Sequence, residues 1–252
     1  MRRVLKMSCT FVQVLGKGMM RRPTTRAGHP LVRRTRTDMS RSGGSAPQRD
    51  TPVLTERGGV RKAAILEAAL RVIGDKGLAG LSMRAIATEA GLPLGALGYY
   101  FKTKDDLILE AFELHTRREA DRVLAAFAGV GTGDHADDVA EHLTAFIRHG
   151  LTEARTSLVA EYEFLIEATR RPDLARVSRA WRQALQIQVG HVASRLGSDD
   201  PETDAEILLS VVAGLEIDHL STPLDPSTTQ AIRTTLRRTI TRLGLRGDAE
   251  RL

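Results

Sequence analysis

The sequence predicts an all-α protein of about nine helices, arranged as an N-terminal three-helix domain followed by a larger helical domain. From Val60 onward, apolar residues recur every three or four positions, which is the period of a helix that buries one face. Pro172, Pro201, Pro223 and Pro226 fall between the periodic segments, where proline begins or ends helices. We find no convincing alternation of apolar and polar residues and no internal repeat, so neither strands nor a repeat architecture is expected.

The helices and domains follow in order from these patterns. Helices are expected at residues 60–76, 83–90, 94–101, 103–127, 136–150, 156–171, 173–196, 203–220 and 227–243. Residues 1–57 are rich in Arg, Ser, Thr, Gly and Pro and show little periodicity, which indicates a disordered basic tail. The chain is therefore divided into that tail, a three-helix domain of residues 58–106 and a helical domain of residues 107–246.

Residues 82–104, SMRAIATEAGLPLGALGYYFKTK, form the most informative stretch. Ile86 and Ala87 lie on one helical face, and Gly91 ends that helix because glycine adopts the left-handed conformation without a clash. Leu97 and Phe101 give the following helix an inward face of its own. Two short helices joined by a glycine turn form a helix-turn-helix, whose second helix lies in the DNA major groove. The pattern predicts a DNA-binding protein.

The segment from about Val60 to Leu107 resembles the DNA-binding domain of the TetR family of bacterial transcriptional regulators. The residues that fit the family pattern are Ala68, Gly77, Ser82, Ile86, Ala87, Gly91, Leu97, Tyr100, Phe101 and Lys104. The resemblance implies a homodimeric repressor that binds a palindromic DNA operator and is released by a small-molecule effector. It also implies that helices between about residues 105 and 200 enclose the effector pocket.

The recognition helix is poor in side chains that form hydrogen bonds. Pro93 stands where the family usually carries a capping Ser or Thr, and proline cannot cap in that way. We expect specificity to come from Arg84, Tyr99, methyl contacts along the helix and DNA shape. Tyr100 is either a phosphate contact or a core residue beside Phe101. The expected DNA-binding residues are Ser82, Arg84, Leu94, Gly95, Ala96, Gly98, Tyr99, Tyr100, Thr103 and Lys104.

Two apolar stripes near the C-terminus predict a dimer interface. A two-fold dimer gains DNA affinity by binding two half-sites, so one part of the chain has to dimerise. The expected interface residues are Leu208, Val211, Val212, Leu215, Ile232, Leu236 and Ile240. Packed against their symmetry mates, the last two helices would form a four-helix interface. The alternative is that both stripes close the core of the single chain.

Candidate effector-binding residues are the aromatic and polar groups that fall on mainly apolar helix faces. They are Phe112, His115, Phe146, Tyr162, Trp181, Gln188 and His191, with Phe164 and His219 as further candidates. Trp181, Gln188 and His191 are spaced so that all three share one helix face. Each of them is also compatible with an ordinary core or surface position.

The charge of the chain is divided unevenly. Residues 1–58 hold 13 Lys and Arg against 3 Asp and Glu, whereas residues 59–252 hold 24 against 28. The net charge of +6 therefore belongs to the tail. The tail either adds contacts to DNA phosphates or is not required, and translation starting at Met20 or Met39 is a further possibility. No apolar run reaches the roughly 18 residues of a membrane helix, and Cys9 is alone, so a cytoplasmic protein without disulfides is expected.

The sequence shows few signs of catalytic, cofactor or metal sites. No nucleophile elbow, dinucleotide fingerprint or metalloprotease pair is present, so we expect neither an enzyme nor a cofactor. His142 and His149 share a helix face near two aspartates, but their spacing is too wide for adjacent metal ligands, and no metal is expected. Three alternatives to a repressor stay open. They are an activator or ligand-independent regulator, a helical enzyme or small-molecule carrier with an incidental helix-turn-helix, and a non-specific DNA-coating protein.

Overall fold

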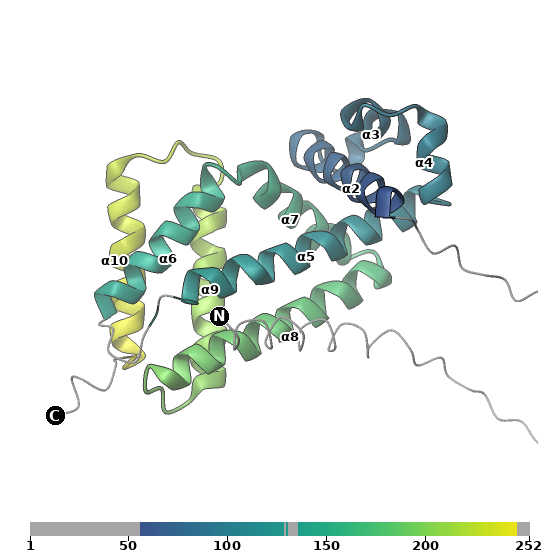
Figure 1. Ribbon diagram of the computed structural model, residues 1–252. Coiled ribbons are helices and arrows are strands. Elements are labelled where there is room, and N and C mark those ends of the chain that lie inside the picture. The colour runs from purple at the N-terminus through teal and green to yellow at the C-terminus, as the bar shows by residue number, and fades with distance from the viewer. Residues whose placement is uncertain (1–55, 129, 131–135, 246–252) are drawn as a thin grey trace, which may run out of the picture.

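The computed structural model describes residues 56–128, 130 and 136–245, and the expected N-terminal tail lies almost wholly outside these ranges (Figure 1). The described residues form nine α-helices and confirm the all-α fold. These helices are α2 (Glu56–Lys76), α3 (Met83–Ala90), α4 (Leu94–Tyr100), α5 (Lys104–Ala128), α6 (Ala136–Leu151), α7 (Arg155–Ala168), α8 (Pro172–Arg195), α9 (Pro201–His219) and α10 (Pro226–Arg242). A short 3₁₀ helix, η1 (Leu78–Gly80), lies between α2 and α3 and was not expected from the sequence.

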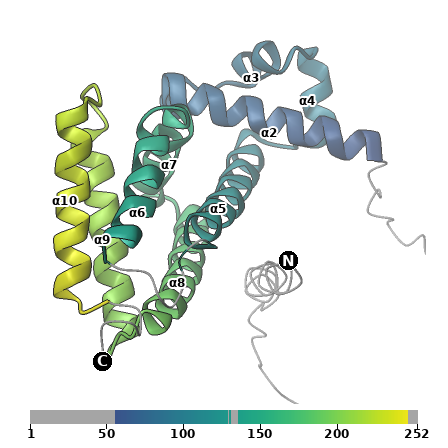
Figure 2. The same ribbon diagram turned by 60° about the vertical axis from the view of Figure 1, so that its left-hand side comes forward.

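Helices α2, α3 and α4 form a small domain, which we call the head, at one end of the molecule (Figures 1 and 2). Its core is built from Ile65 and Ile73 of α2, Ile86 of α3 and Leu97 of α4, all fully buried. Gly91 adopts φ 65° and ψ 32° after α3, and the N–H of Leu92 donates to the carbonyl of Ala87 at 2.9 Å. This left-handed glycine turn redirects the chain into α4, as the sequence predicts.

Helix α5 joins the head to the rest of the molecule. It begins with a capping box, in which the Asp106 N–H donates to Thr103 Oγ1 at 3.0 Å and the Thr103 N–H donates to Asp106 Oδ2 at 3.1 Å. Its first turns bury Leu107 and Phe112 under the head, while its later turns run between the other long helices (Figure 2). One continuous helix therefore belongs to both hydrophobic cores.

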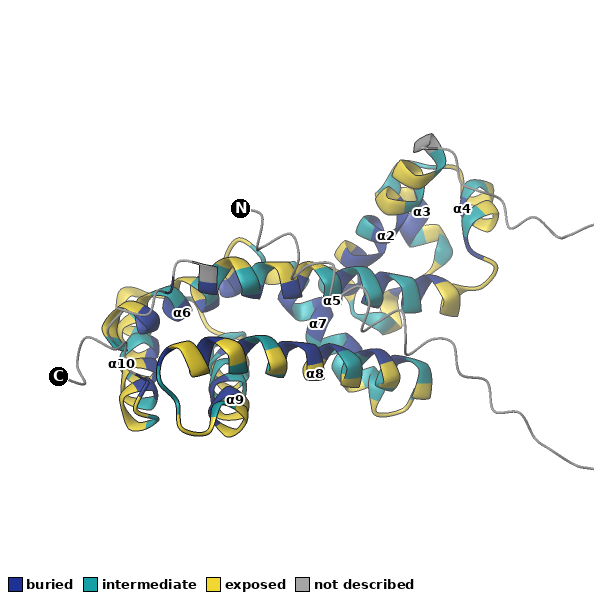
Figure 3. Cartoon of the chain, turned by 60° about the horizontal axis from the view of Figure 1, so that its bottom comes forward, coloured by how far each residue is buried: buried dark blue, intermediate teal, exposed yellow. Residues whose placement is uncertain are grey.

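Helices α6 to α10, with the second half of α5, form the body. Figure 3 shows exposed residues on the outer sides of these helices and buried residues between them. Helix α9 packs beside α8, and α10 packs along α6 at the edge of the body (Figure 2). None of the helices in the described ranges is long and apolar enough to cross a membrane.

Part of the expected dimer interface is buried within the single chain. Leu208, Ile232, Leu236 and Ile240 are buried within the single chain, where they join the core of the body. Their side chains pack against helices such as α6 and are therefore not available to a second subunit. Of the other predicted interface residues, Val211, Val212 and Leu215 are half-buried and pack against the same core. Four of the seven predicted interface residues are thus core residues of the single chain, and the three half-buried ones stay predicted interface residues.

Candidate functional site

The predicted DNA-binding residues gather on the outer surface of the head. Ser82, Arg84, Leu94, Gly95, Gly98, Tyr99, Thr103 and Lys104 are exposed, and Ala96 and Tyr100 are half-buried. Neither Arg84 nor Lys104 forms an ion pair with any residue that the structure describes, so both charges are available to a ligand. Ser82 caps α3 by accepting the N–H of Ala85 at 3.1 Å, while its hydroxyl hydrogen stays available to donate.

The outer face of α4 is apolar and open. An added Cβ at Gly95 or Gly98 would meet nothing within 4 Å, so neither glycine is required by packing inside the chain. Tyr99 is 73% exposed and lies edge-on to Tyr100, with the ring centroids 5.0 Å apart. Leu97 is the one residue of α4 that is fully buried. The helix therefore rests on a single anchor and turns an aromatic and a glycine surface outward.

A cavity of about 130 Å³ lies in the body. It is lined by Glu119, Arg122, Val123, Phe146, Glu161, Tyr162, Leu165, Ser178, Trp181, Arg182, Leu185, Leu209, Val212, Ala213 and Glu216. Three candidate effector residues, Phe146, Tyr162 and Trp181, are among them. The lining comes from α5, α6, α7, α8 and α9, so the cavity exists only when the body is assembled.

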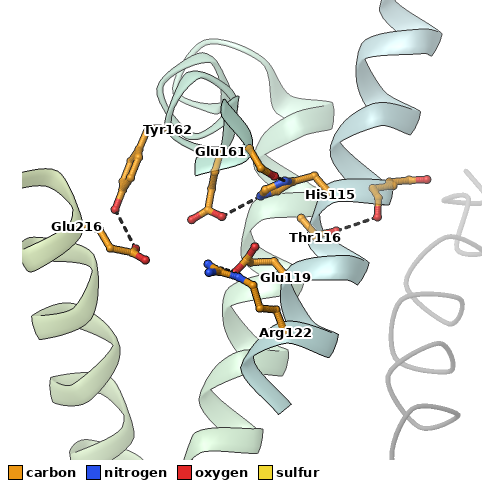
Figure 4. Close-up of polar contacts among 9 residues, drawn as sticks. His115, Thr116, Glu119, Arg122, Glu161, Tyr162 and Glu216 are labelled. Atoms are coloured by element: carbon orange, nitrogen blue, oxygen red, sulfur yellow. Dashed lines mark hydrogen bonds and ion pairs between the residues drawn. The ribbon is translucent and has the colours of Figure 1, made fainter. Parts of the chain in front are cut away.

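One side of this cavity carries a network of buried charged groups (Figure 4). Nε2 of His115 lies 2.8 Å from Oε2 of Glu161, and Nδ1 of His115 lies 3.4 Å from the hydroxyl of Ser157. Arg122 forms an ion pair with Glu119 one turn earlier on α5, and its guanidinium lies 3.9 Å from the ring centroid of Phe146. Burial, followed by repulsion from Glu161, raises the pKa of Glu119 above its ordinary value.

Glu216 faces this network from α9 (Figure 4). Its Oε2 accepts a hydrogen bond from the hydroxyl of Tyr162 at 3.4 Å, whereas its buried Oε1 has no hydrogen-bond partner. Burial, followed by the negative charge of Glu161, raises the pKa of Glu216 to about 8. Burial is also the main reason that the pKa of Tyr162 is raised. The indole N–H of Trp181 is a second buried polar group without a partner on this cavity.

The remaining candidate effector residues lie outside the cavity lining. Phe112 is buried between head and body and stacks on Phe164, with the ring centroids 4.7 Å apart. Gln188 is half-buried further along α8, and His191 is exposed on a separate groove beside the start of α9. His219 is half-buried at the end of α9. Gln188 and His191 share a helix face with Trp181 but do not line the cavity. Helix α8 extends beyond the cavity, and both residues lie in that extension.

Sequence reasoning missed the carboxylates. No sequence pattern singled out Glu161, which is only 8% exposed. Glu119 and Glu216 likewise interrupt apolar faces of long helices. Acidic residues are rarely buried without a partner, and the spacing of His115 and Glu119, one helical turn apart, was the available signal.

Helix α7 connects the cavity to the head through consecutive residues. Glu161 and Tyr162 line or border the cavity, whereas Oε2 of Glu163 accepts the N–H of Leu78 in η1 at 2.9 Å. The next residue, Phe164, is fully buried against Phe112. Helix α7 therefore contacts both the cavity and the base of the head.

Comparisons with known proteins agree with this geometry. Residues 65–111 match the family described as "Bacterial regulatory proteins, tetR family", and residues 134–242 match the "Tetracyclin repressor-like, C-terminal domain". The transcriptional regulator PksA of Bacillus subtilis is 48% identical over 63 residues, a match that spans 25% of this chain and 31% of PksA. The curated match with PksA thus covers about a third of that protein.

Two solved structures resemble most of the described chain. A TetR family member from Streptomyces coelicolor, SCO1917, is 33% identical with a TM-score of 0.54, and the match covers 71% of this chain and 97% of SCO1917. The multidrug binding protein EbrR, solved with ethidium, is 34% identical with a TM-score of 0.54, over 71% of this chain and 98% of EbrR. Both parts of the chain match TetR models, and a TetR family member is 33% identical over nearly its whole length. The chain therefore belongs to the TetR family of DNA-binding transcriptional regulators.

Proposed function

We propose that this protein is a homodimeric repressor that binds a palindromic operator and is released when a small molecule occupies the cavity. The proposal rests on the contacts of four consecutive residues of α7. Residues 161 and 162 line the cavity, Glu163 accepts a hydrogen bond from η1, and Phe164 packs on Phe112 at the base of the head. Repression is favoured over activation because a protein seated on an operator blocks polymerase without any further contact. Its place of action is the cytoplasm, where bacterial DNA lies.

A second copy is proposed to dock on the outward face of α9. Ile207, Ser210 and Gly214 are exposed there at helical spacing, and nothing lies within 4 Å of a Cβ added at Gly214. The small side chains at positions 210 and 214 favour close approach of a symmetry-related helix, and Ile207 offers it an apolar contact. This face replaces the buried residues that the sequence pattern suggested.

Replacing Gly214 with Arg tests the dimer without disturbing the core. Gly214→Arg should sediment as a monomer and bind a palindromic site about 100-fold more weakly, because one head alone makes too few contacts. Ala145→Arg on the exposed side of α6 is the matched control and should stay dimeric. A dimeric Gly214→Arg protein with full affinity would exclude this interface.

Operator preference is tested by selecting sites from a random duplex library with the full chain. We expect a two-fold symmetric consensus whose half-sites are separated by about 34 Å or a multiple of this distance. The proposed contacts are the exposed side chains of the head, with Arg84 and Tyr99 at base edges and Lys104 at a phosphate. Enrichment of no sequence over bulk duplex would favour a non-specific DNA-coating protein instead.

The proposed effector is a small, largely apolar molecule that fits the polar atoms left without partners. It would donate a hydrogen bond to Oε1 of Glu216 and accept one from the indole N–H of Trp181. EbrR has been solved with ethidium, proflavin and malachite green, which supports an aromatic ligand. Ligand pockets commonly measure about 300–1,000 Å³, so a cavity of about 130 Å³ has to widen on binding. Widening moves α7 and thereby the head.

Trp181 is the single tryptophan of the chain and reports directly on the cavity. Malachite green should quench its fluorescence and release labelled operator DNA over the same concentration range. Val212→Phe fills the cavity and should weaken both effects at least about tenfold, whereas Ile187→Phe on the exposed side of α8 should not. Quenching without operator release would separate ligand binding from regulation and refute the coupling along α7.

A further inference from the structure

The wall of the cavity between α5 and α7 brings together one imidazole and two carboxylates. Ligand atoms of His115, Glu119 and Glu161 all lie within 4.8 Å of one another, and the described residues contain no other group of three such side chains. His115 and Glu119 are one turn apart on α5, and Glu161 faces them from α7. Two helices separated by the whole of α6 therefore converge on one point (Figure 4).

All three side chains are removed from solvent, with exposed fractions of 2% for His115, 9% for Glu119 and 8% for Glu161. Glu216, which is 5% exposed, adds a third carboxylate, and Arg122 is the permanent positive charge among them. Buried charges are stable when they are paired or coordinate a metal, and here carboxylates outnumber their cationic partners. The unpartnered Oε1 of Glu216 is a separate sign that this cluster lacks a ligand.

The surroundings of the three side chains are those of a metal site. Nδ1 of His115 lies 3.4 Å from the hydroxyl of Ser157, which leaves Nε2 directed at Glu161. A histidine that binds metal through one nitrogen usually holds its other N–H in a hydrogen bond. Both contacts that Arg122 makes with Glu119 go to Oε1, which fixes the carboxylate at the end of one turn of α5.

We propose that Nε2 of His115 and one carboxylate oxygen each from Glu119 and Glu161 bind a divalent first-row transition metal ion. When the ion binds, Nε2 of His115 carries no proton, and the neutral imidazole holds its one proton on Nδ1, where it donates to the hydroxyl of Ser157. One imidazole with two carboxylates suits Zn²⁺, Mn²⁺ or Fe²⁺ better than Mg²⁺ or Ca²⁺, which prefer oxygen alone, or Cu⁺, which prefers sulfur. The remaining coordination positions face the cavity, where Glu216 or a water molecule completes the shell.

The test uses the full chain, free of any histidine tag and stripped with a chelator, and titrates it with Co²⁺ as a coloured probe. One Co²⁺ per chain should bind with a visible absorption band, Zn²⁺ should displace it, and Mg²⁺ should not. Glu161→Gln and His115→Asn should each weaken Co²⁺ binding by well over tenfold. Ser157→Ala should weaken it about tenfold, an effect that a simple His115–Glu161 hydrogen bond does not predict.

Matched controls separate this site from adventitious binding. His191→Asn and Glu153→Gln change exposed residues of the same two types and should leave the Co²⁺ spectrum unchanged. If Glu161→Gln fails to fold by circular dichroism, the spectrum of the native chain and the Ser157→Ala variant still decide the question. A native chain that shows no Co²⁺ band overturns the proposal, as does a band that survives His115→Asn. Binding of malachite green with no binding of any metal also overturns it, and none of these outcomes depends on operator binding.

Discussion

The head and the cavity place functional side chains in opposite ways. In the head, Arg84, Tyr99 and Lys104 stand in solvent on a frame held by short-range contacts such as the Gly91 turn. In the cavity, Glu161 and Glu216 are buried and come from helices far apart in the sequence. A DNA surface can be built locally because its charges need no partner within the chain. A buried polar cavity depends on the whole body, because each charge there needs neighbours that tolerate it.

The largest expected effect comes from removing the anchor of the recognition helix. Leu97→Ala should destabilise the head by about 2–5 kcal/mol, because a fully buried leucine leaves a cavity. Operator affinity in gel-shift titrations should fall at least about 100-fold. The thermal transition followed by Trp181 fluorescence should shift less than that of the head, because Trp181 lies in the body. Leu94→Ala, on the exposed face of the same helix, is the control for stability. A joint loss of head and body would show that the two regions are not independent.

The second prediction concerns the buried carboxyl group of Glu216 in metal-free protein. Its pKa is raised to about 8 in the folded chain, mainly by burial, and returns to the ordinary value near 4.5 on unfolding. Between these pH values the folded state holds one more proton than the unfolded state, so stability falls as pH rises from about 5 to 8. The slope contributed by one proton is at most about 1.4 kcal/mol per pH unit.

Urea titrations of the native chain and of Glu216→Gln across this pH range test that prediction. Glu216→Gln cannot ionise, so its stability should lose most of the dependence on pH between 5 and 8. Glu202→Gln, at an exposed position of the same helix, should keep the native profile. Identical slopes for the native chain and Glu216→Gln would mean that this carboxyl is not the group that titrates.

A smaller effect is expected for a single phosphate contact. Lys104→Ala should weaken operator binding about tenfold and reduce the slope of log affinity against log salt by about one. The loss should be the same for every DNA sequence, because a phosphate contact carries no base preference. Arg84→Ala should instead relax the preferred sequence. Arg238→Ala, exposed on α10 away from the head, is the control for net charge. A change of consensus in Lys104→Ala would place this side chain at a base edge.

The smallest effect is expected at the N-terminus of α3. Ser82→Ala removes the acceptor of the Ala85 N–H and should cost about 1 kcal/mol of head stability. Ser82→Asp restores a capping oxygen and should recover that stability, but it should weaken DNA binding because a carboxylate repels phosphate. Chemical denaturation combined with gel shifts separates the two roles. If Ser82→Asp binds DNA as well as the native chain, Ser82 is a cap and not a phosphate contact.

The agreement between sequence and structure follows the same division. The limits of α3 and the Gly91 turn were predicted, because each is set by residues a few positions apart. The body helices were expected within a few residues of their bounds, since prolines mark several of their starts. Phe146, Tyr162 and Trp181 were named as candidates and line the cavity, although whether they bind an effector stays a prediction.

The sequence by itself determined the helices, their order and the exposed surface of the head, because helical period, caps and turns are short-range properties. Only the tertiary structure decided which apolar stripe is core and which is free. It buried Ile232 and Leu236 against the body and left Ile207 outside. Tertiary packing also brought Glu161 to His115 across two helices. The helical period gives the face on which a residue lies but not the element that covers that face, and burial of a charge is set by that covering element.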